Sequence, residues 1–80
     1  QEEIMILPNP GSNVFQVVSR NPSLRMIEIF NILGQKVESV DLEKNPLKTM
    51  FIDASTWSAG TYFIRINTEN LVYSKKWLKY

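Results

Sequence analysis

Seven short apolar segments, separated by turn-forming residues, constrain the fold of this chain more than any other feature of its sequence. They lie at residues 4–7, 13–18, 24–31, 36–42, 48–53, 61–67 and 71–80. The connections between them are rich in the Gly, Pro, Asn and Ser residues that turns require. No window of helical length carries apolar residues at the i, i+3, i+4, i+7 spacing of an amphipathic helix. The sequence therefore predicts an all-β fold, a small Ig-like antiparallel β-sandwich of about seven strands.

Alternation of apolar and polar residues within these segments indicates which side chains form the core. Tyr62, Ile64 and Ile66 share one face of the most regular segment, as in a strand with one buried face. The matching inward pairs on other segments are Phe15 with Val17, Ile27 with Ile29, and Met50 with Ile52. In residues 71–80 both faces carry lysine together with apolar residues, so alternation leaves open which face is buried.

The stretch DASTWSAGTYFIRI, residues 53–66, is the most sharply patterned part of the chain. A β-sandwich chain crosses between sheets at corners, where a tyrosine early in the outgoing strand bonds to upstream backbone, and Tyr62 fits that position. Gly60 then supplies a conformation that a β-carbon would penalise, and Trp57 fills the core beneath the turn. Asp53 or Ser55 is expected to bond to nearby backbone amides.

The composition excludes most kinds of catalytic or ligand site. The 80 residues, which suit one domain, contain no histidine and no cysteine, so a nucleophilic triad and a zinc site lack their usual residues. The acidic residues are scattered, and Gly34 in ILGQK is a hairpin turn rather than a phosphate loop. A net charge of +1 does not favour nucleic-acid binding. We therefore expect no enzyme, cofactor or metal, and neither a signal peptide nor a membrane span is visible.

Four motif blocks, in order, resemble the C-terminal sorting domain of type IX secretion (Por secretion) cargo proteins. They are a Pro-Asn-Pro near the start, an Asn-x-x-Gly-x-x-Val block, an Asp-x-Ser-x-x-x-x-Gly-x-Tyr block, and a lysine-bearing end KKWLK. The motif residues are Pro8, Asn9, Pro10, Asn31, Gly34, Val37, Asp53, Trp57, Gly60 and Tyr62. Trp57 stands where the family usually has leucine, and Trp77 stands where a smaller aliphatic residue is commoner.

The resemblance implies a label at the end of a larger cargo protein of a Bacteroidota-type bacterium. Residues 4–80 would form the sorting domain, and residues 1–3 would be a remnant of the linker to an N-terminal cargo domain. The cargo would pass through the periplasm to the outer membrane and reach the cell surface or the medium. Its implied partners are the type IX outer-membrane translocon, shuttle proteins, and a sortase-like protease that removes the domain and attaches the cargo to the cell surface.

The resemblance also implies that the final segment carries recognition. The residues expected to contact the translocon or the sortase are Lys75, Lys76, Trp77, Leu78, Lys79 and Tyr80. The same lysines could instead protect an edge strand from pairing with neighbours. The alternative function is a fibronectin-like adhesive or carbohydrate-binding module, since β-sandwiches host many functions. The isolated domain could also form a domain-swapped homodimer.

Overall fold

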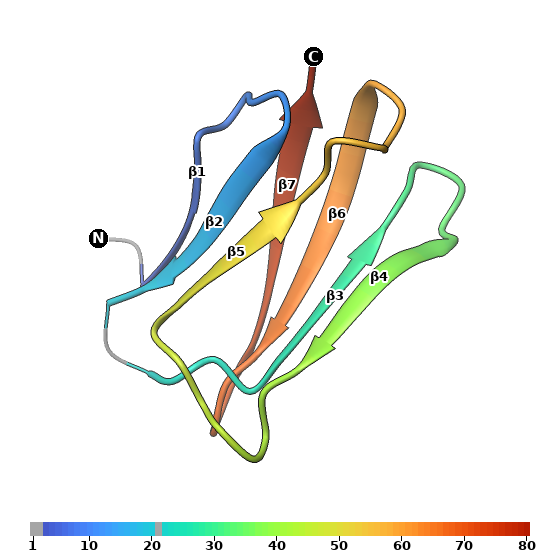
Figure 1. Cartoon of the computed structure of the whole chain (residues 1–80). Coiled ribbons are helices and arrows are strands. Elements are labelled where there is room, and N and C mark those ends of the chain that lie inside the picture. The colour runs from blue at the N-terminus through green and yellow to red at the C-terminus, as the bar shows by residue number, and fades with distance from the viewer. Residues whose placement is uncertain (1–2, 21) are drawn as a thin grey trace.

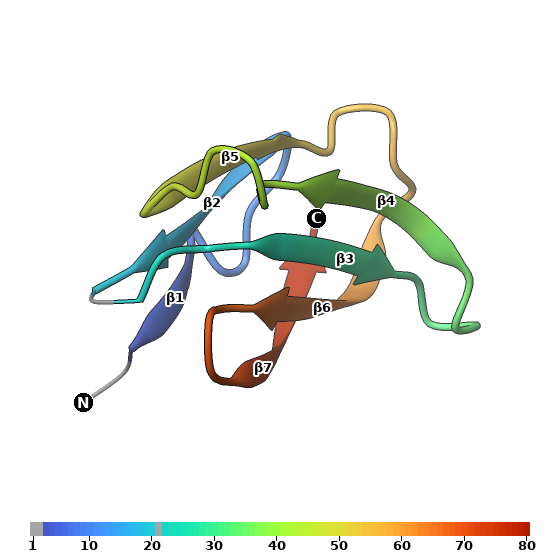
Figure 2. The same cartoon turned by 90° about the horizontal axis from the view of Figure 1, so that it is seen from below.

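The computed structural model describes residues 3–20 and 22–80, and it confirms the predicted β-sandwich. Its strands are β1 (Ile4–Leu7), β2 (Val14–Ser19), β3 (Met26–Phe30), β4 (Lys36–Asp41), β5 (Thr49–Asp53), β6 (Gly60–Asn67) and β7 (Val72–Lys79). They form one sheet in the order β1-β2-β5 and a second in the order β4-β3-β6-β7. All neighbouring strands are antiparallel. Figures 1 and 2 show the two sheets as two facing layers.

The predicted linker remnant is described only at its last residue. Gln1 and Glu2 lie outside the described residues. Glu3 is exposed, and its carbonyl accepts a hydrogen bond of 2.8 Å from the amide of Arg20. The first strand therefore begins directly after a residue that is hydrogen-bonded to the residue following β2.

The chain changes sheets three times, between β2 and β3, between β4 and β5, and between β5 and β6. The other connections are hairpins within one sheet. The β2–β3 and β4–β5 connections, which make the first two changes, lie side by side. The amide of Leu24 in the first donates to the carbonyl of Leu47 in the second at 2.7 Å. In the register of β3 against β4 there is a shift between Ile29 and Phe30, so the β4 edge is locally irregular.

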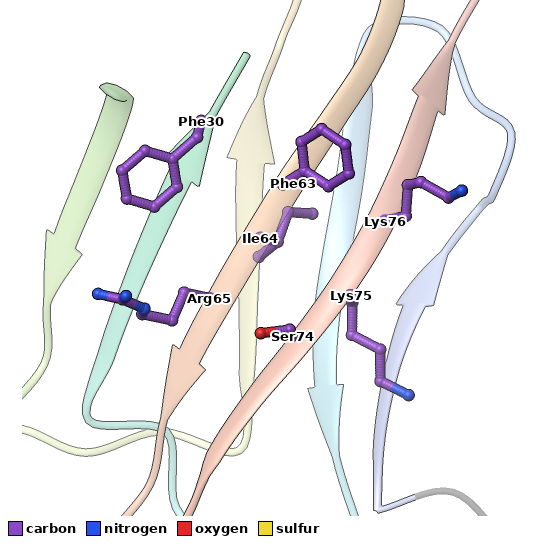
Figure 3. A pocket seen from close by; sticks show the side chains of 7 residues that line it. All are labelled: Phe30, Phe63, Ile64, Arg65, Ser74, Lys75 and Lys76. Carbon is purple, nitrogen blue, oxygen red and sulfur yellow. The ribbon is translucent and has the colours of Figure 1, made fainter. Parts of the chain in front are cut away.

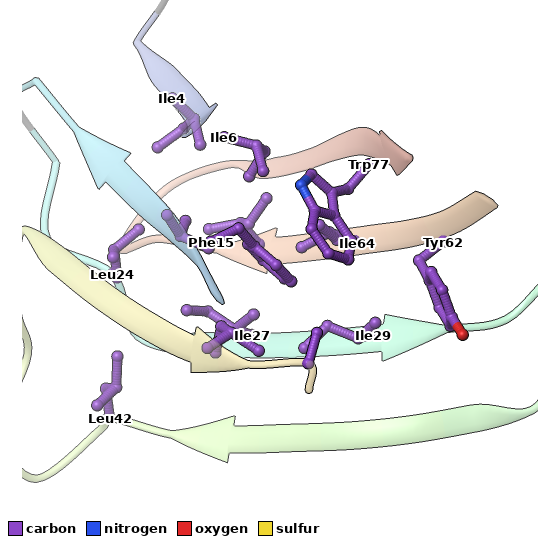
Figure 4. Close-up of a cluster of buried hydrophobic side chains, with 14 residues drawn as sticks. Ile4, Ile6, Phe15, Leu24, Ile27, Ile29, Leu42, Tyr62, Ile64 and Trp77 are labelled. Atoms are coloured by element: carbon purple, nitrogen blue, oxygen red, sulfur yellow. The ribbon is translucent and has the colours of Figure 1, made fainter. Parts of the chain in front are cut away.

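The core consists of the inward faces of both sheets, as the alternation predicted (Figure 4). Its buried apolar members are Ile4, Ile6, Phe15, Val17, Leu24, Ile27, Ile29, Leu42, Ile52, Ala54, Tyr62, Ile64, Ile66 and Trp77. Met50 is only partly buried and packs against this cluster. Trp57, expected to fill the core, is likewise partly buried at its margin. The centre at this end of the sandwich is filled by Trp77 instead.

Strand β7 resolves the question that alternation left open. Trp77 is fully buried and Lys79 is only 7% exposed, whereas Lys76, Leu78 and Tyr80 face solvent. The face of β7 that also carries Tyr73 is therefore the inner one. Residues 3–20 and 22–80 form no helix that is long and apolar enough to cross a membrane.

Candidate functional site

Three connections and the end of β7 bring the sequence motifs together at one end of the sandwich (Figure 1). We call this region the motif end and define it as residues 8–11, 31–37, 53–62 and 75–80. A hollow of about 400 Å³ lies between the β3–β4 turn and the β5–β6 connection, and residues of both line it. Motif blocks that are far apart in the sequence are thus parts of one structural region.

The Asn-x-x-Gly block forms the turn between β3 and β4, as predicted. The side-chain oxygen of Asn31 accepts hydrogen bonds from the amides of Leu33 and Gln35, both at 3.0 Å. Gly34 has a φ of 82°, a conformation that glycine adopts at little cost. The side chains of Ile32 and Leu33 remain 73% and 78% exposed at the tip. The block therefore specifies the turn, and it also places two aliphatic side chains in solvent.

The Asp-x-Ser-x-x-x-x-Gly-x-Tyr block forms the corner between β5 and β6. The hydroxyl of Tyr62 donates to the carbonyl of Ser58 at 2.5 Å, and Gly60 has a φ of 143°. A carboxylate oxygen of Asp53 accepts from the amide of Ser55 at 2.9 Å. The Ser55 hydroxyl, the same amide and the nearby charge of Lys79 hold the pKa of Asp53 below its ordinary value. These contacts confirm the predicted tyrosine corner.

The side chain of Lys79 binds the backbone of the same corner from inside the sandwich. Its ammonium nitrogen donates to the backbone carbonyls of Ala54 at 2.7 Å and Trp57 at 2.6 Å, and lies 3.4 Å from that of Ser55. A buried lysine needs partners for its three N–H groups, because an unpaired buried charge is costly. The carbonyls of the β5–β6 connection provide those partners, so Lys79 fixes the path of this connection.

Trp77 links β7 to the β1–β2 connection. Its indole N–H donates to the carbonyl of Pro8 at 2.7 Å, and its ring lies 4.3 Å from that of Phe15, centroid to centroid. Gly11 packs against the same indole, since a β-carbon at this position would lie 3.1 Å from the ring. Glycine therefore lets the β1–β2 connection approach this closely without displacing the ring.

The backbone of β7 is also paired with the β1–β2 connection. The side-chain amide of Asn9 donates to the carbonyl of Lys76 at 2.8 Å, and its oxygen accepts from the amide of Leu78 at 3.2 Å. Gly11 donates to the carbonyl of Leu78 at 3.0 Å and accepts from the amide of Tyr80 at 2.9 Å. The outer edge of β7 is thus covered along its last residues by the segment containing Pro-Asn-Pro.

Comparison with known protein families shows which family contains this chain. A family model described as the secretion system C-terminal sorting domain matches residues 5–80. The chain belongs to this family. It is therefore a C-terminal sorting signal of type IX secretion, which implies export across the outer membrane to the cell surface or out of the cell. No curated protein matches the chain.

The structure of the sorting domain divides the six predicted recognition residues into two groups. The exposed group is Lys76, Leu78 and Tyr80, and the inward-facing group is Lys75, Trp77 and Lys79. Lys75 is half-buried, whereas the other two inward-facing residues are buried. Only the exposed group and part of Lys75 present side chains to a partner of the folded domain.

Two functions of motif residues in the sorting domain were not found from the sequence. Asn9 uses both ends of its side-chain amide to bind β7, a distance of 67 and 69 residues along the chain. Lys79 serves as an internal cation, although lysine is among the residues least often buried. The sequence signal for a buried lysine was that lysine and tryptophan recur on one face of residues 71–80. This signal was ambiguous because the other face also carries lysine.

The contacts at the motif end are those of a structural framework. Asp53 bonds to the corner backbone, and Lys79 is saturated by carbonyls. In the described part of the chain no three residues of the His, Cys, Asp or Glu types are grouped as metal ligands. The side chains that the region leaves exposed include apolar ones, among them Ile32, Leu33 and Leu78.

Proposed function

We propose that this domain directs an N-terminal cargo domain across the outer membrane by type IX secretion. In this proposal, shuttle and translocon proteins recognise the domain on the periplasmic side. A sortase-like protease then removes the domain and attaches the cargo to the cell surface. The observation that carries the proposal is the family match over residues 5–80, whose motif blocks lie together at one end of the sandwich.

The recognition surface in this proposal is the exposed side of the last strand. Lys76, Leu78 and Tyr80 offer a charge and two apolar groups, with Leu78 43% and Tyr80 74% exposed. Trp77 and Lys79 act indirectly, since their hydrogen bonds to the β1–β2 and β5–β6 connections hold the strand in place. This assignment separates residues that contact the machinery from residues that position them.

A second copy of the domain is a further partner of β7 in isolation. Exchange of β7 between two copies would supply each with the Trp77 and Lys79 of the other, so the contacts of these residues would be kept while the turn between Thr68 and Leu71 opened. In this proposal residues 1–3 are a remnant of the linker that would present the bond cut by the protease. The adhesive alternative gains no specific support, because Trp57, Tyr62 and Trp77 pack against one another rather than on a shared exposed face.

The test uses a fluorescent reporter that folds in the periplasm, with residues 1–80 fused to its C-terminus, in a bacterium with a working type IX system. We expect surface or medium fluorescence from this fusion and none from the reporter alone. The variant with alanine at Lys76, Leu78 and Tyr80 should fold normally and remain in the periplasm. Its matched control carries alanine at the exposed Lys44 and Lys48, at the opposite end of the sandwich, and should be exported.

Each outcome addresses a different part of the proposal. Retention of the wild-type fusion in the periplasm would contradict the sorting function. Export of the triple-alanine variant at the wild-type rate would place recognition elsewhere on the domain. Melting curves of the purified domains show whether a retained variant is folded.

A further inference from the structure

A second surface lies on the outer face of the sheet β4-β3-β6-β7, away from the core. One cross-strand row on this face consists of Lys36, Phe30, Phe63 and Lys76, as the strand register places each opposite the next. The adjacent row contains Glu28, Arg65 and Ser74. We call these seven residues the outer row face. It combines three cations and two phenylalanines with a single carboxylate.

A hollow of about 440 Å³ is formed on this face (Figure 3). Phe30, Phe63, Arg65, Ser74 and Lys76 are among the residues that line it. In Figure 3 the two phenylalanine rings and the Arg65 side chain stand on β3 and β6, while Ser74 and Lys76 lie on the edge strand β7. The hollow therefore spans β3, β6 and the edge strand β7, and the cationic residues Arg65 and Lys76 line it together with Phe63.

The charges of this face do not cancel. Glu28 binds both Lys36, at 2.9 Å, and Arg65, at 3.4 Å, and its side chain is only 13% exposed. The hydrogen bond from Lys36 is the main cause that keeps the pKa of Glu28 below its ordinary value, so this carboxylate is ionised near neutral pH. One negative charge thus faces three positive ones. Lys76 makes no ion pair with a residue in the described ranges 3–20 and 22–80.

The two phenylalanines differ in how well they are covered. The charged ends of Lys36 and Arg65 both lie 6.0 Å from the ring centre of Phe30, within cation–π range. Phe63 is 44% exposed in the middle of the sheet face. Intramolecular contacts therefore account for the first ring and leave the second ring available to a partner.

The chemistry of this face fits an acidic protein segment better than a sugar. Arginine and aromatic residues are enriched at protein interfaces, and the exposed apolar side chain of Leu78 continues the face along β7. A sugar needs several neutral hydrogen-bonding groups, and Ser74 is the one hydroxyl residue among the described residues that line the hollow. A carboxylate-bearing segment would satisfy the excess positive charge of Arg65 and Lys76.

We propose that the outer row face is a docking surface for an acidic segment of a partner protein. An apolar side chain of that segment packs on Phe63, and carboxylates on either side of it bind Arg65 and Lys76. The assignment of this partner to the export machinery rests on the proposed function, whereas the docking surface itself does not. It extends recognition from the end of β7 across β6 to β3.

The binding test uses a displayed library of random linear peptides selected on the purified 80-residue chain. The selected peptides should carry carboxylates next to an apolar or aromatic residue. Their affinity should fall about tenfold with Lys76→Glu, Arg65→Gln or Phe63→Thr, and should fall as salt is added. Lys48→Glu, a charge reversal on an exposed residue outside this face, is the matched control and should bind normally. Melting curves confirm that each variant is folded.

Three outcomes would overturn the inference. Selected peptides without acidic residues would contradict the predicted ligand chemistry, and equal binding to all variants would contradict its location. Binding of heparin, or of vesicles containing phosphatidylglycerol, through Lys76 and Phe63 in the absence of peptide binding would contradict the choice of a protein partner.

The reporter assay separates this inference from the proposed function. Normal export of Arg65→Gln and Phe63→Thr together with the loss of peptide binding would show that the partner is not part of the export machinery. Retention of the wild-type fusion would reject the sorting function and leave the peptide result standing by itself.

Discussion

A single buried lysine fixes much of the motif end. Lys79 is 7% exposed and gives its N–H groups to carbonyls of the β5–β6 connection, 22 to 25 residues earlier in the chain. The positive charge of Lys79 is stabilised by the dipoles of these carbonyls rather than by direct contact with a carboxylate. The terminal lysines of the sequence therefore differ in environment, since Lys76 points outward and Lys79 points inward.

Replacement of this lysine by an apolar residue of similar length separates its structural role from recognition. Lys79→Met removes the ammonium donor from the carbonyls of Ala54 and Trp57 and leaves that of Ala54 with only the amide of Trp57, which should lower the free energy of unfolding by about 2–4 kcal/mol. Urea unfolding followed by tryptophan fluorescence measures this loss. Lys76→Met, on the exposed face, should change stability by less than about 0.5 kcal/mol. Equal unfolding curves for the two variants would refute the internal role of Lys79.

At the scale of strands, much could be predicted from the sequence. Turn residues and alternation located all seven strands, the Gly34 turn and the Tyr62 corner, because each follows from local rules of backbone conformation. The buried face of β7 could not be predicted, since lysine occurs on both of its faces and only the carbonyls of a distant connection make one lysine an inner residue. The link from Trp77 to Pro8 depends on tertiary packing in the same way.

The candidate site was predictable to a smaller extent. The motif residues were named from the resemblance, and the structure places them at one end of the molecule. Their partners were not predictable, because Asn9 and Gly11 contact β7 across nearly the full length of the sequence. The outer row face was also missed. Its residues look like ordinary outward positions until the register aligns Phe30, Phe63 and Lys76 across three strands.

The ion pairs between β3, β4 and β6 predict a measurable dependence on pH. The pKa of Glu28 is lower in the folded state than its ordinary value of 4.5, chiefly through Lys36. Its contribution to stability is therefore present above pH 4.5 and is lost as the pH falls through the folded-state pKa. In Lys36→Met the pKa of Glu28 should rise towards 4.5, and the variant should lose less stability than wild type over the same acid range.

NMR titration of the Glu28 side-chain carboxyl measures this pKa directly, and urea unfolding at several pH values measures the linked stability. Lys44→Met removes a lysine from the β4–β5 connection and should leave the Glu28 titration unchanged. An unaltered Glu28 pKa in Lys36→Met would show that the ion pair has no effect in solution.

At the scale of the whole molecule, the last residues complete the core. A chain of this length has a net stability of about 4–12 kcal/mol, and removal of a buried tryptophan costs about 3–5 kcal/mol. Trp77 is fully buried, and it lies within the same few residues as Lys79. The final strand is therefore as much a part of the fold as any internal strand.

Deletion of residues 76–80 should consequently unfold the whole domain rather than shorten it. We expect the truncated chain to lose the dispersed amide spectrum of a folded β-sandwich, because the costs of losing Trp77 and Lys79 together approach the total stability. One-dimensional NMR and circular dichroism measure this outcome. Preserved dispersion and a cooperative melting transition in the truncated chain would contradict it. A secretion defect of such a truncation then reports unfolding as well as lost recognition.

The pairing of residues 8–11 with residues 76–80 also governs when the domain can fold. A polypeptide that emerges from a ribosome or a membrane pore with its N-terminus first releases six strands before the seventh. During this interval the indole that contacts Phe15 and Pro8 is missing, and one hydrogen-bonding edge of β6 lacks its partner strand. Contacts across such a long sequence separation form late and slowly. Completion of the fold therefore waits until the final residues are free, because the two segments that pair lie at opposite ends of the sequence.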